Sequence, residues 1–527
     1  MQRPLGAQIS HMLKDRGVEV IFGIPGVHNQ ELYRGIEEAG IAHILARHEQ
    51  GAGFMADGYA RATGKPGVAY VITGPGVCNI MTPMGQAYSD SVPLLVVSSC
   101  LDETAAKKGQ LHQMKDQRLA AETVCDWSEE ARSAEVAYAL VNRAFAEFAC
   151  MRPLPKHIQV PVPVLEAQAD AASKVDHVPG NIGAQDSDVA AAAELLTQAE
   201  RPLFVLGGGA VRATASIRSI LKQLQAASYT TYAGCGIAGL DDPLHFGAIL
   251  EPENSVAELR KADLLVCIGT DLAEVDFYRA ELGHDAPAIH VNIEPAVLAR
   301  AGADDRAHLA DAETWCARLS DLLQDHVAAT GWSPAEVAAA RASGRRAMER
   351  TYPGIPALCD ALRAAVPPET MIYSDMTQIA YTAKVVWDMD RPGHWHHPCG
   401  FGTLGYATPA AIGGAVARRD KPTMAMIGDY GFHYTMQELG VAVELGLSLP
   451  IVLWDNGKLK EIEDSMVRAQ IAPNAVIARN PDFCNLARAF GAEAKAPASL
   501  ATLQDDLRGA FEAKGPTLIH LTPDILA

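Results

Sequence analysis

Short apolar runs alternate with amphipathic helical patterns from one end of this chain to the other. Near the N-terminus an apolar helical stripe ends at Gly17, and the run 18–24 that follows predicts a buried strand. A second helix is expected over 29–39 and a second strand over 43–46. Successive parallel strands need a crossover connection, usually a helix, so this alternation predicts a parallel sheet covered by helices on both faces.

The chain is too long for one such sheet. A single hydrophobic core stops growing well below 527 residues, so the strands must be divided among several domains. We predict an α/β protein of three doubly wound parallel-sheet domains, over 1–167, 188–325 and 352–527. The further strands are expected over 68–72, 94–98, 203–206, 264–268, 288–293, 371–374, 423–427, 450–454 and 517–521.

Two stretches separate the expected domains. Residues 166–188 are polar and Ala-rich, which is typical of a linker, and 325–350 are rich in Ala and Arg, which predicts a connecting helix. The Gly207–Gly209 turn in the middle domain looks like a dinucleotide loop, but Arg212 breaks the G-x-G-x-x-G spacing. A glycine-lined turn between strand and helix is therefore the favoured interpretation, with nucleotide binding as the alternative.

Composition narrows the classes of function. No apolar run approaches the roughly 20 residues of a membrane helix, so no membrane partner is expected. A net charge of -19 argues against nucleic acid binding, which needs clustered Lys and Arg, and mildly favours a cationic substrate. The ten cysteines show no C-x-x-C pair and no zinc spacing. Without an export signal in the first residues, the expected location is cytoplasmic.

Two strand ends in the third expected domain carry oxygen ligands. One strand is followed by Gly428-Asp429 and the next by Asp455-Asn456. In a parallel sheet both ends lie on the carboxyl edge, where ligands bind at the switch in strand order. A carboxylate and an amide oxygen suit a hard divalent ion, and Mg²⁺ shared with a diphosphate is the simplest prediction. Taken alone, a Gly-Asp pair after a strand is usually an ordinary turn.

Other segments agree and carry a family resemblance. The spacing from Gly428-Asp429 to Asn456 resembles the thiamine diphosphate motif. The chain is identified as a member of the superfamily of thiamine-diphosphate-dependent 2-oxo acid decarboxylases and acetolactate synthases, whose segments occur here in the family's order. The matching segments are GIPG at 23–26, RHEQGAGFMADGYAR at 47–61, TGPGVCN at 73–79 and GTLG at 402–405 followed by PAAIGGA.

Four stretches are similar to one group within that superfamily, the 5-guanidino-2-oxopentanoate (2-ketoarginine) decarboxylases: PGVHNQELYRGI, LHQMKDQ, SDMTQIAYTA and PDFCNLARAFGA. The resemblance implies conversion of that 2-oxo acid to 4-guanidinobutanal and CO₂ in arginine catabolism. An acetolactate synthase-type carboligase acting on pyruvate is the alternative, although 109–117 carries no acetolactate-type signature. A third alternative is an inactive binding or regulatory subunit, suggested only by Tyr430.

The resemblance also implies catalytic roles. Glu49 is expected to share a proton with the aminopyrimidine ring of the cofactor; its structural alternative is a carboxylate favoured by a helix N-terminus. His112 and Gln113 occupy the place of groups that handle protons during the reaction, and His28 is expected to face the cofactor. Surface or loop histidines are the alternatives for both His residues.

The cofactor set implied by the resemblance is larger. Gly402 would offer its carbonyl to the exocyclic amine, and Leu404, otherwise an ordinary core leucine, would keep the cofactor bent. Asp429 and Asn456, with a backbone carbonyl near Lys458, are expected to hold Mg²⁺. Further contacts are expected from Pro25, Gly26, Gly74, Asn79, Met376, Thr377, Gln378, Thr403, Gly428, Tyr430 and Gly431.

Departures from the family pattern lie beside the metal motif. Tyr430 stands where the family usually has Gly or a small residue, so the turn must accommodate a phenol without glycine's freedom at positive φ. Further on, Glu461 and Asp464 are candidates to bind a guanidinium, because such groups favour carboxylates; the alternative is a solvated helix face. The histidines of GHWHH, at 394, 396 and 397, lack a carboxylate partner and are left out of the metal set.

The family's architecture implies an assembly. One subunit binds the pyrimidine half of the cofactor and its partner binds the diphosphate half, so a homodimer, or a homotetramer of two such dimers, is expected with active sites at the subunit interface. A flavin (FAD) in the middle domain, as in some relatives, is the less favoured alternative.

Overall fold

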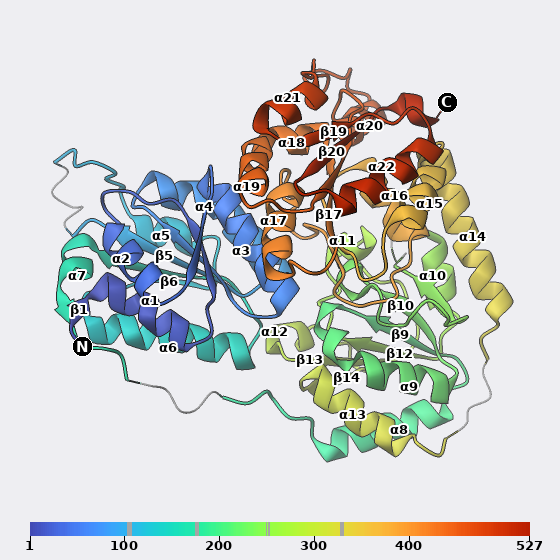
Figure 1. The fold of residues 1–527 in the computed structure, drawn as a ribbon. Coiled ribbons are helices and arrows are strands. Elements are labelled where there is room, and N and C mark those ends of the chain that lie inside the picture. Colours follow the sequence, from blue (N-terminus) through green and yellow to red (C-terminus); the bar gives the residue numbers. More distant parts are fainter. Residues whose placement is uncertain (103–107, 174–178, 249, 251–252, 327–330, 527) are drawn as a thin grey trace.

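The computed structural model describes residues 1–102, 108–173, 179–248, 250, 253–326 and 331–526. Figure 1 shows three α/β units, each with a six-stranded parallel sheet between layers of helices. The prediction of three doubly wound parallel-sheet domains is confirmed. Among the described helices, none is long and apolar enough to cross a membrane.

The first unit opens the chain and is drawn in blue to cyan in Figure 1. Its strands are β2 (Val20–Gly23), β3 (Ala42–Leu45), β4 (Gly67–Val71), β5 (Leu94–Cys100), β6 (Trp127–Glu130) and β7 (Lys156–Pro161), in the sheet order β3-β2-β4-β5-β7-β6. Its helices are α1 (Leu5–Asp15), α2 (Gln30–Glu38), α3 (Glu49–Thr63), α4 (Pro75–Asp90), α5 (Gln117–Glu122), α6 (Ala134–Cys150) and α7 (Val162–Glu166). An antiparallel pair, β1 (Arg3–Pro4) with β8 (Gln168–Ala169), joins its two ends.

The middle unit has the strand order of a dinucleotide-binding fold, β11-β10-β9-β12-β13-β14. Its strands are β9 (Pro202–Leu206), β10 (Ala227–Thr230), β11 (His245–Gly247), β12 (Leu264–Ile268), β13 (Ala288–Asn292) and β14 (Arg306–Leu309). Its helices are α8 (Asp186–Gln198), α9 (Thr214–Leu224), α10 (Glu253–Leu259), α11 (Glu274–Phe277), α12 (Pro295–Leu298) and α13 (Ala312–Leu322). The helix α14 (Pro334–Thr351) then leads to the third unit.

The third unit is drawn in orange to red in Figure 1. Its strands are β15 (Met371–Ser374), β16 (Trp395–His396), β17 (Thr423–Gly428), β18 (Pro450–Trp454), β19 (Glu493–Lys495) and β20 (Thr517–Leu521), in the order β16-β15-β17-β18-β20-β19. Its helices are α15 (Ile355–Ala365), α16 (Gln378–Val386), α17 (Ala407–Ala417), α18 (Asp429–Thr435), α19 (Leu439–Glu444), α20 (Lys460–Arg468), α21 (Phe483–Phe490) and α22 (Leu500–Glu512).

One hydrophobic core joins the first and third units. Helices α3 and α17 pack with their backbones in close approach, because a Cβ at Gly58 would lie 2.0 Å from the Ala410 carbonyl and one at Gly413 would lie 1.9 Å from the Met55 carbonyl. Phe54 and Tyr406 meet edge to face across this contact, at 5.6 Å. The helix that begins at Glu49 is therefore fixed rigidly against the third unit.

The sequence located the apolar strands and missed polar ones. Strands β12, β15, β18 and β20 have the expected bounds, whereas β7 was not expected because it begins with Lys156 and His157. Both side chains are buried and satisfied: Lys156 pairs with Asp126 at 2.8 Å, and His157 bonds to two serines. Burial lowers the pKa of His157 to about 3, so the ring is neutral. A prediction from the periodicity of apolar residues cannot anticipate such pairing of buried polar side chains.

The connecting segments differ from expectation at their edges. The expected linker 166–188 contains β8 and the start of α8 at Asp186, while 174–178 lie outside the described residues. The expected connecting helix over 325–350 begins only at Pro334. The reason is local, because Ser333 and Glu336 form a capping box that fixes the helix start there, and 327–330 lie outside the described residues.

Candidate active site

Strand order brings the predicted cofactor segments to two sheet edges. In the first and third units the strands run 2-1-3-4-6-5 when numbered along each unit, so the order switches between β2 and β4 and between β15 and β17. Ligands of open α/β sheets bind outside the carboxyl ends of the strands at this point. These ends lead into 24–26 and 73–76 in the first unit, and into 375–378 and 428–431 in the third.

Glu49 and Asn79 lie together at the first of these edges. Glu49 is the first residue of α3, is 8% exposed, and accepts a hydrogen bond at Oε2 from Asn79 Nδ2 at 2.9 Å. Gly76 lies beside the carboxyl group, since a Cβ there would lie 3.4 Å from Glu49 Oε1. The start of α4 therefore orients this carboxylate, as a group that exchanges a proton requires.

Two predicted histidines face each other beside the same turn. The rings of His28 and His112 lie 5.0 Å apart, and within the described residues each buried Nδ1 has no hydrogen-bond partner. Burial, and then the neighbouring His112, lower the pKa of His28, which favours a neutral ring. His112 has φ +64°, and its carbonyl lies where a Cβ at Gly74 would be only 2.6 Å away. Such backbone strain in a non-glycine residue is concentrated at functional sites.

The neighbours of these histidines are arranged by their own backbone contacts. The Gly26 N–H donates to Asn29 Oδ1 at 2.7 Å, which fixes the turn after Pro25. The Gln113 N–H donates to the Gln110 carbonyl at 3.1 Å. Sequence analysis did not single out Asn29 as a site residue; its side chain holds this turn and does not cap α2.

Thr377 and Gln378 lie at the second edge. Thr377 Oγ1 is buried with no partner in the described part of the chain, and it would lie 3.7 Å from a Cβ at Gly428. Gln378 Oε1 accepts from Trp454 Nε1 and from Asn456 Nδ2, both at 2.9 Å. An unpaired buried hydroxyl beside a glycine turn is the kind of group that a phosphate oxygen satisfies.

The predicted metal ligands converge on this edge. Because Asn456 Nδ2 is bound by Gln378, its Oδ1 points the other way, where it accepts from the Lys458 N–H at 3.1 Å. Gly457, with φ +68°, makes the turn between them. Among the described residues no group of three His, Cys, Asp or Glu side chains could hold a metal ion. The predicted ligands are instead the Asp429 carboxylate, the Asn456 amide oxygen and a backbone carbonyl near Lys458, and such oxygen ligands suit a hard cation.

Asn480 is a part of this site that sequence analysis missed. Its Nδ2 donates at 2.7 Å to both Asp429 Oδ2 and Asp455 Oδ1. Burial raises the pKa of Asp429, and the hydrogen bond from Asn480 opposes that rise. No sequence signal marks Asn480, because it lies 24 residues after Asn456 in a loop.

Asp375 is the second missed residue, and it holds the loop 400–405, which is the predicted cofactor loop. It is fully buried, and its carboxylate accepts from the Met376 and Gly405 N–H groups, each at 2.8 Å. Burial raises the pKa of Asp375 to about 6. Gly431 must be glycine here, because a Cβ would lie 2.9 Å from Asp375 Oδ2. Asp375 directly follows β15, so the rule that ligands bind at the carboxyl ends of parallel strands would have pointed to it.

Three family models match this chain. They are the N-terminal TPP binding domain of thiamine pyrophosphate enzymes over residues 3–119, the central domain over 189–319 and the C-terminal TPP binding domain over 375–521. This chain belongs to the thiamine pyrophosphate enzyme family. The prediction of a thiamine-diphosphate-dependent enzyme is therefore confirmed, and the first and third units are its two TPP binding domains.

Similar proteins cover the whole length of this family member. The probable 2-ketoarginine decarboxylase AruI of Pseudomonas aeruginosa is 41% identical, over 98% of this chain and 93% of its own. The large subunits of acetolactate synthase isozymes 1 and 2 of Escherichia coli are each 28% identical, over 99% of this chain and 94% and 96% of theirs.

Two glycines of the loop 402–405 in this thiamine pyrophosphate enzyme have positive φ angles. Gly402 has φ +65° and Gly405 has φ +85°, conformations that favour glycine. Leu404 between them is half-buried, and Thr403 is buried. The exposure of Leu404 distinguishes it from the core leucines of the same unit.

The expected strain at Tyr430 is a point on which the sequence interpretation was wrong. Tyr430 is the second residue of α18 and is not among the residues with positive φ. A helical backbone suits any residue, so the phenol requires none of glycine's freedom at this position. Its effect on cofactor affinity stays a prediction.

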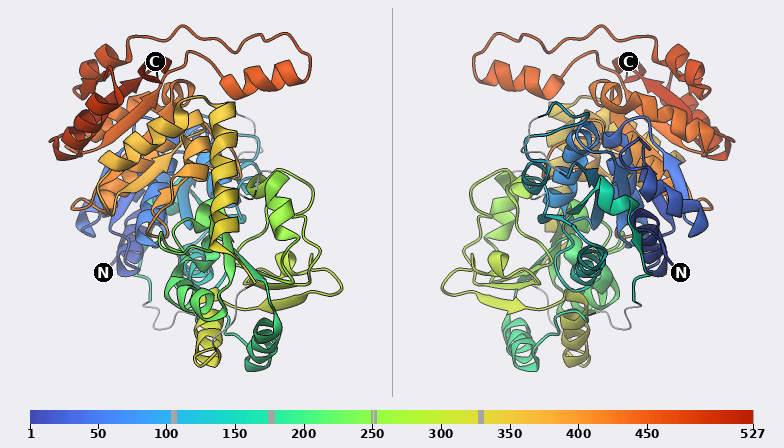
Figure 2. Two further views of the ribbon diagram at one scale, coloured as in Figure 1. Left: turned by 90° about the vertical axis from the view of Figure 1, so that its right-hand side faces the viewer. Right: turned by 90° about the vertical axis from the view of Figure 1, so that its left-hand side faces the viewer.

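Helix α20 carries the predicted substrate carboxylates away from the body of the protein. None of its residues is buried, and Figure 2 shows it projecting at the top of the third unit. Asp464 forms an ion pair with Lys460, and Glu463 pairs with Lys458 at 3.1 Å. Glu461 instead accepts a hydrogen bond from the Tyr352 hydroxyl and pairs with no cation of the described chain. The structure thus separates Glu461 from Asp464, which the sequence treated alike.

The histidines of GHWHH serve the packing of the third unit. His397 Nδ1 bonds to Ser374 Oγ at 2.9 Å and its ring stacks on Tyr232 at 4.7 Å. Burial lowers the pKa of His397 to about 3. His394 Nδ1 instead bonds to the Pro392 carbonyl at 3.0 Å, so the rings have separate partners.

In the middle unit the glycines of 207–209 pack against the next strand. The Gly209 N–H donates to the Gly269 carbonyl at 2.9 Å, and a Cβ at Gly207 would lie 2.2 Å from that carbonyl. A cavity of about 120 Å³ lies beside them, and the ion pair of Arg152 with Asp271 at 2.8 Å lines it. The contacts give these glycines a packing role, and a flavin at this edge stays the less favoured alternative.

Proposed function

We propose that this enzyme decarboxylates 5-guanidino-2-oxopentanoate to 4-guanidinobutanal and CO₂, as a cytoplasmic step of arginine catabolism. The observation that carries the proposal is the 41% identity, over nearly the whole of both chains, to a probable 2-ketoarginine decarboxylase. The acetolactate synthases are as well covered but only 28% identical, so a carboligase acting on pyruvate is the second candidate.

The third unit would hold the cofactor's diphosphate and Mg²⁺. Asp429, Asn456 and the carbonyl of Lys458 supply the oxygen ligands that Mg²⁺ prefers. The unpartnered Thr377 hydroxyl beside Gly428 suits a diphosphate oxygen. When bound, thiamine diphosphate supplies a nucleophilic carbon and an electron sink for the bonding pair that stays behind when CO₂ leaves.

In the first unit, the chain's own groups would manage the protons. Glu49 would share a proton with the aminopyrimidine ring, and Asn79 would keep its carboxyl group oriented through Oε2. His28 and His112 are close enough to act on one substrate, and each has a ring nitrogen that no described residue occupies. An imidazole is a side chain suited to accepting and returning a proton during catalysis.

Glu461 would select the cationic end of the substrate. Its carboxylate has no paired cation in the described chain, whereas Asp464 and Glu463 are each neutralised by a lysine. A guanidinium bonds a carboxylate through two parallel N–H groups, which gives both affinity and direction. The net charge of -19 would further attract a cationic substrate.

A second copy of the chain would complete each site, in a homodimer or a homotetramer. Exposed apolar side chains lie on segments next to the predicted cofactor residues: Val27 is 62% exposed, Tyr88 46%, Phe401 48% and Tyr434 52%. They lie on the turn before α2, on α4, on the cofactor loop and on α18. A closed two-fold contact between copies would cover them.

The test is a panel of 2-oxo acids. Aldehyde and CO₂ are measured from 5-guanidino-2-oxopentanoate, pyruvate, benzoylformate and branched-chain acids, with and without thiamine diphosphate and Mg²⁺. Cofactor-dependent turnover strongest on the guanidino acid is expected. Acetolactate formed from pyruvate would replace the proposal by the carboligase, and an absence of turnover on every acid would overturn both.

A further inference from the structure

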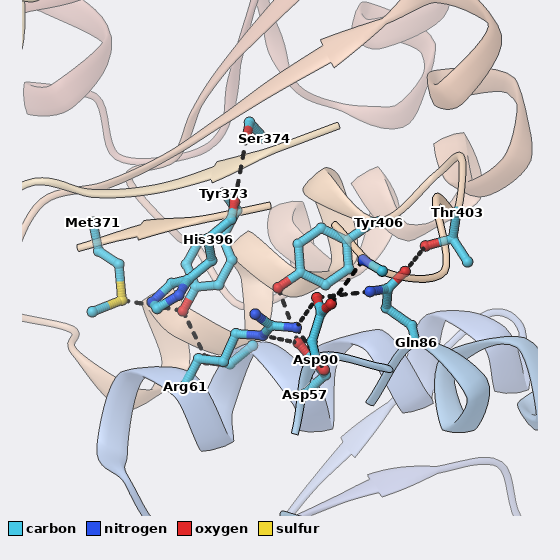
Figure 3. Close-up of polar contacts among 12 residues, drawn as sticks. Asp57, Arg61, Gln86, Asp90, Met371, Tyr373, Ser374, His396, Thr403 and Tyr406 are labelled. Atoms are coloured by element: carbon cyan, nitrogen blue, oxygen red, sulfur yellow. Dashed lines mark hydrogen bonds and ion pairs between the residues drawn. The ribbon is translucent and has the colours of Figure 1, made fainter. Parts of the chain in front are cut away.

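The cofactor loop is held by the first unit of its own chain. Figure 3 shows Thr403 donating from Oγ1 to Gln86 Oε1, at 2.7 Å. The Gly400 N–H donates to Asp90 Oδ1 at 3.0 Å. Both acceptors lie on α4, the helix that also carries Asn79, so the loop that carries Leu404 is attached to a rigid element more than 300 positions away in the sequence.

A buried ion pair determines how Gln86 is oriented. Gln86 is fully buried, and its Nε2 donates to Asp90 Oδ2 at 2.7 Å. The same oxygen accepts from Arg61 at 2.8 Å, and Arg61 also binds Asp57 at 2.7 Å. The Asp90 carboxylate is paired with Arg61 and accepts hydrogen bonds, so the amide nitrogen of Gln86 faces it. The amide oxygen is therefore turned toward Thr403.

The chain of contacts continues into the third unit. Asp57 Oδ1 accepts from the Tyr406 hydroxyl at 2.9 Å, two residues after Leu404. The loop is thus attached at Gly400, at Thr403 and at Tyr406 to the group formed by Asp57, Arg61, Gln86 and Asp90 (Figure 3). Buried networks in which every member is satisfied hold one geometry strongly, because any displacement leaves a polar group unpaired.

We infer that Gln86 is a positioning residue for thiamine diphosphate, acting through its hydrogen bond to Thr403. The inference rests on the proposed role of the 402–405 loop in binding the cofactor. Gln86 touches the loop and not the reacting atoms, so it fixes where Leu404 and the Gly402 carbonyl lie before the cofactor binds. A preorganised loop binds more tightly because less order is lost on binding.

The test compares cofactor affinity of the apo-protein in a double-mutant cycle. The variants are Thr403→Val, which keeps the shape and removes the hydroxyl, Gln86→Leu, and the two combined. The dissociation constant of thiamine diphosphate at saturating Mg²⁺ is followed by quenching of tryptophan fluorescence, for which Trp454 beside Gln378 is a suitable reporter. Each single change is expected to raise that constant about tenfold, because the loop is then no longer held in place before the cofactor binds.

The combined variant separates positioning from direct contact. If the two residues act through their mutual bond, the double variant binds no worse than either single variant. If Thr403→Val costs the same factor with and without Gln86, Thr403 acts on the cofactor directly and the inference is overturned. Thr403→Ser, which retains the hydroxyl, is expected to restore binding to within about twofold of the unmodified protein.

A matched control and the parent protein complete the design. Thr423→Val removes another buried threonine hydroxyl, at the opposite end of β17, whose Oγ1 has no partner in the described chain; it should leave the affinity unchanged. Equal losses in Thr423→Val and Thr403→Val would mark a general loss of folding and overturn the inference. If the unmodified protein binds no thiamine diphosphate, the proposed function itself fails. If the unmodified protein and all variants bind the cofactor equally well, only the inference about Gln86 is overturned.

Discussion

Asn79 donates a hydrogen bond to Glu49 across the first turns of two helices, with Nδ2 and Oε2 2.9 Å apart. The bond joins α4 to α3 at the carboxyl edge of the first sheet, where its strand order switches. It leaves Glu49 Oε1 beside Gly76, which has no side chain to cover it. Glu49, the proposed activator of the cofactor, is thereby fixed in direction.

Replacing this carboxyl group tests its role. In Glu49→Gln, decarboxylation is expected to fall by about 10²- to 10⁴-fold, the usual contribution of an acid–base group, while the shape is retained. CO₂ release from the preferred 2-oxo acid at saturating cofactor measures it. Glu37→Gln, on the exposed side of α2, is the control. Activity above a tenth of the parent's in Glu49→Gln would contradict the assignment.

Asn480 should matter for Mg²⁺. In Asn480→Ala, Asp429 and Asp455 lose their shared donor, and hydrogen bonds to charged groups contribute about 1.5–3 kcal/mol. The Mg²⁺ concentration for half-maximal activity is expected to change by about tenfold or more. The direction is upward, because the ligand oxygen of Asp429 is no longer held in place. Asn485→Ala, at an exposed position of α21, should leave the Mg²⁺ dependence unchanged.

Glu461 and Asp464 form a matched pair for substrate selection. Glu461→Gln is expected to lower kcat/KM for 5-guanidino-2-oxopentanoate by about tenfold to a hundredfold, as for the loss of a charge-assisted bond, and to change that for pyruvate far less. Asp464→Asn, whose carboxylate already pairs with Lys460, should change neither by more than about twofold. A larger effect in Asp464→Asn would reverse the assignment.

Glu438 predicts a pH dependence of stability. It is fully buried, accepts from the Arg47 N–H and lies near His48 and Glu49; burial raises its pKa to about 7. The folded state therefore binds this proton more tightly than the unfolded state, and the contribution to stability is lost as pH rises from the unfolded pKa through 7. The loss amounts to roughly 3 kcal/mol.

In Glu438→Gln this loss disappears. Its Tm relative to the parent protein should therefore rise between pH 5 and pH 8, by roughly 3 °C or more. Thermal unfolding of both proteins across that range measures the difference. The exposed Glu512→Gln should show no such trend. A constant difference between Glu438→Gln and the parent at every pH would show that Glu438 does not titrate in this range.

The local pattern of the sequence was sufficient for the architecture and for the outline of the site. Apolar strands such as β12 and β18 were recognisable because burial on both faces leaves a continuous apolar run. Glu49, Asp429 and Asn456 were chosen because a strand or a family segment directly precedes each, and their roles stay predictions. Strand β7 was not, because its buried Lys156 and His157 depend on partners from distant elements.

What the sequence determined by itself is the class of the molecule: α/β units in series, a thiamine diphosphate enzyme and the segments that reach the carboxyl edges. Only the tertiary structure decided which carboxylate of α20 stays unpaired, that Asn480 bridges Asp429 and Asp455, and that Gln86 holds Thr403. The physical reason is distance along the chain. Local propensity acts over a few residues, whereas these bonds join positions tens to hundreds of residues apart, and only packing brings their donors and acceptors together.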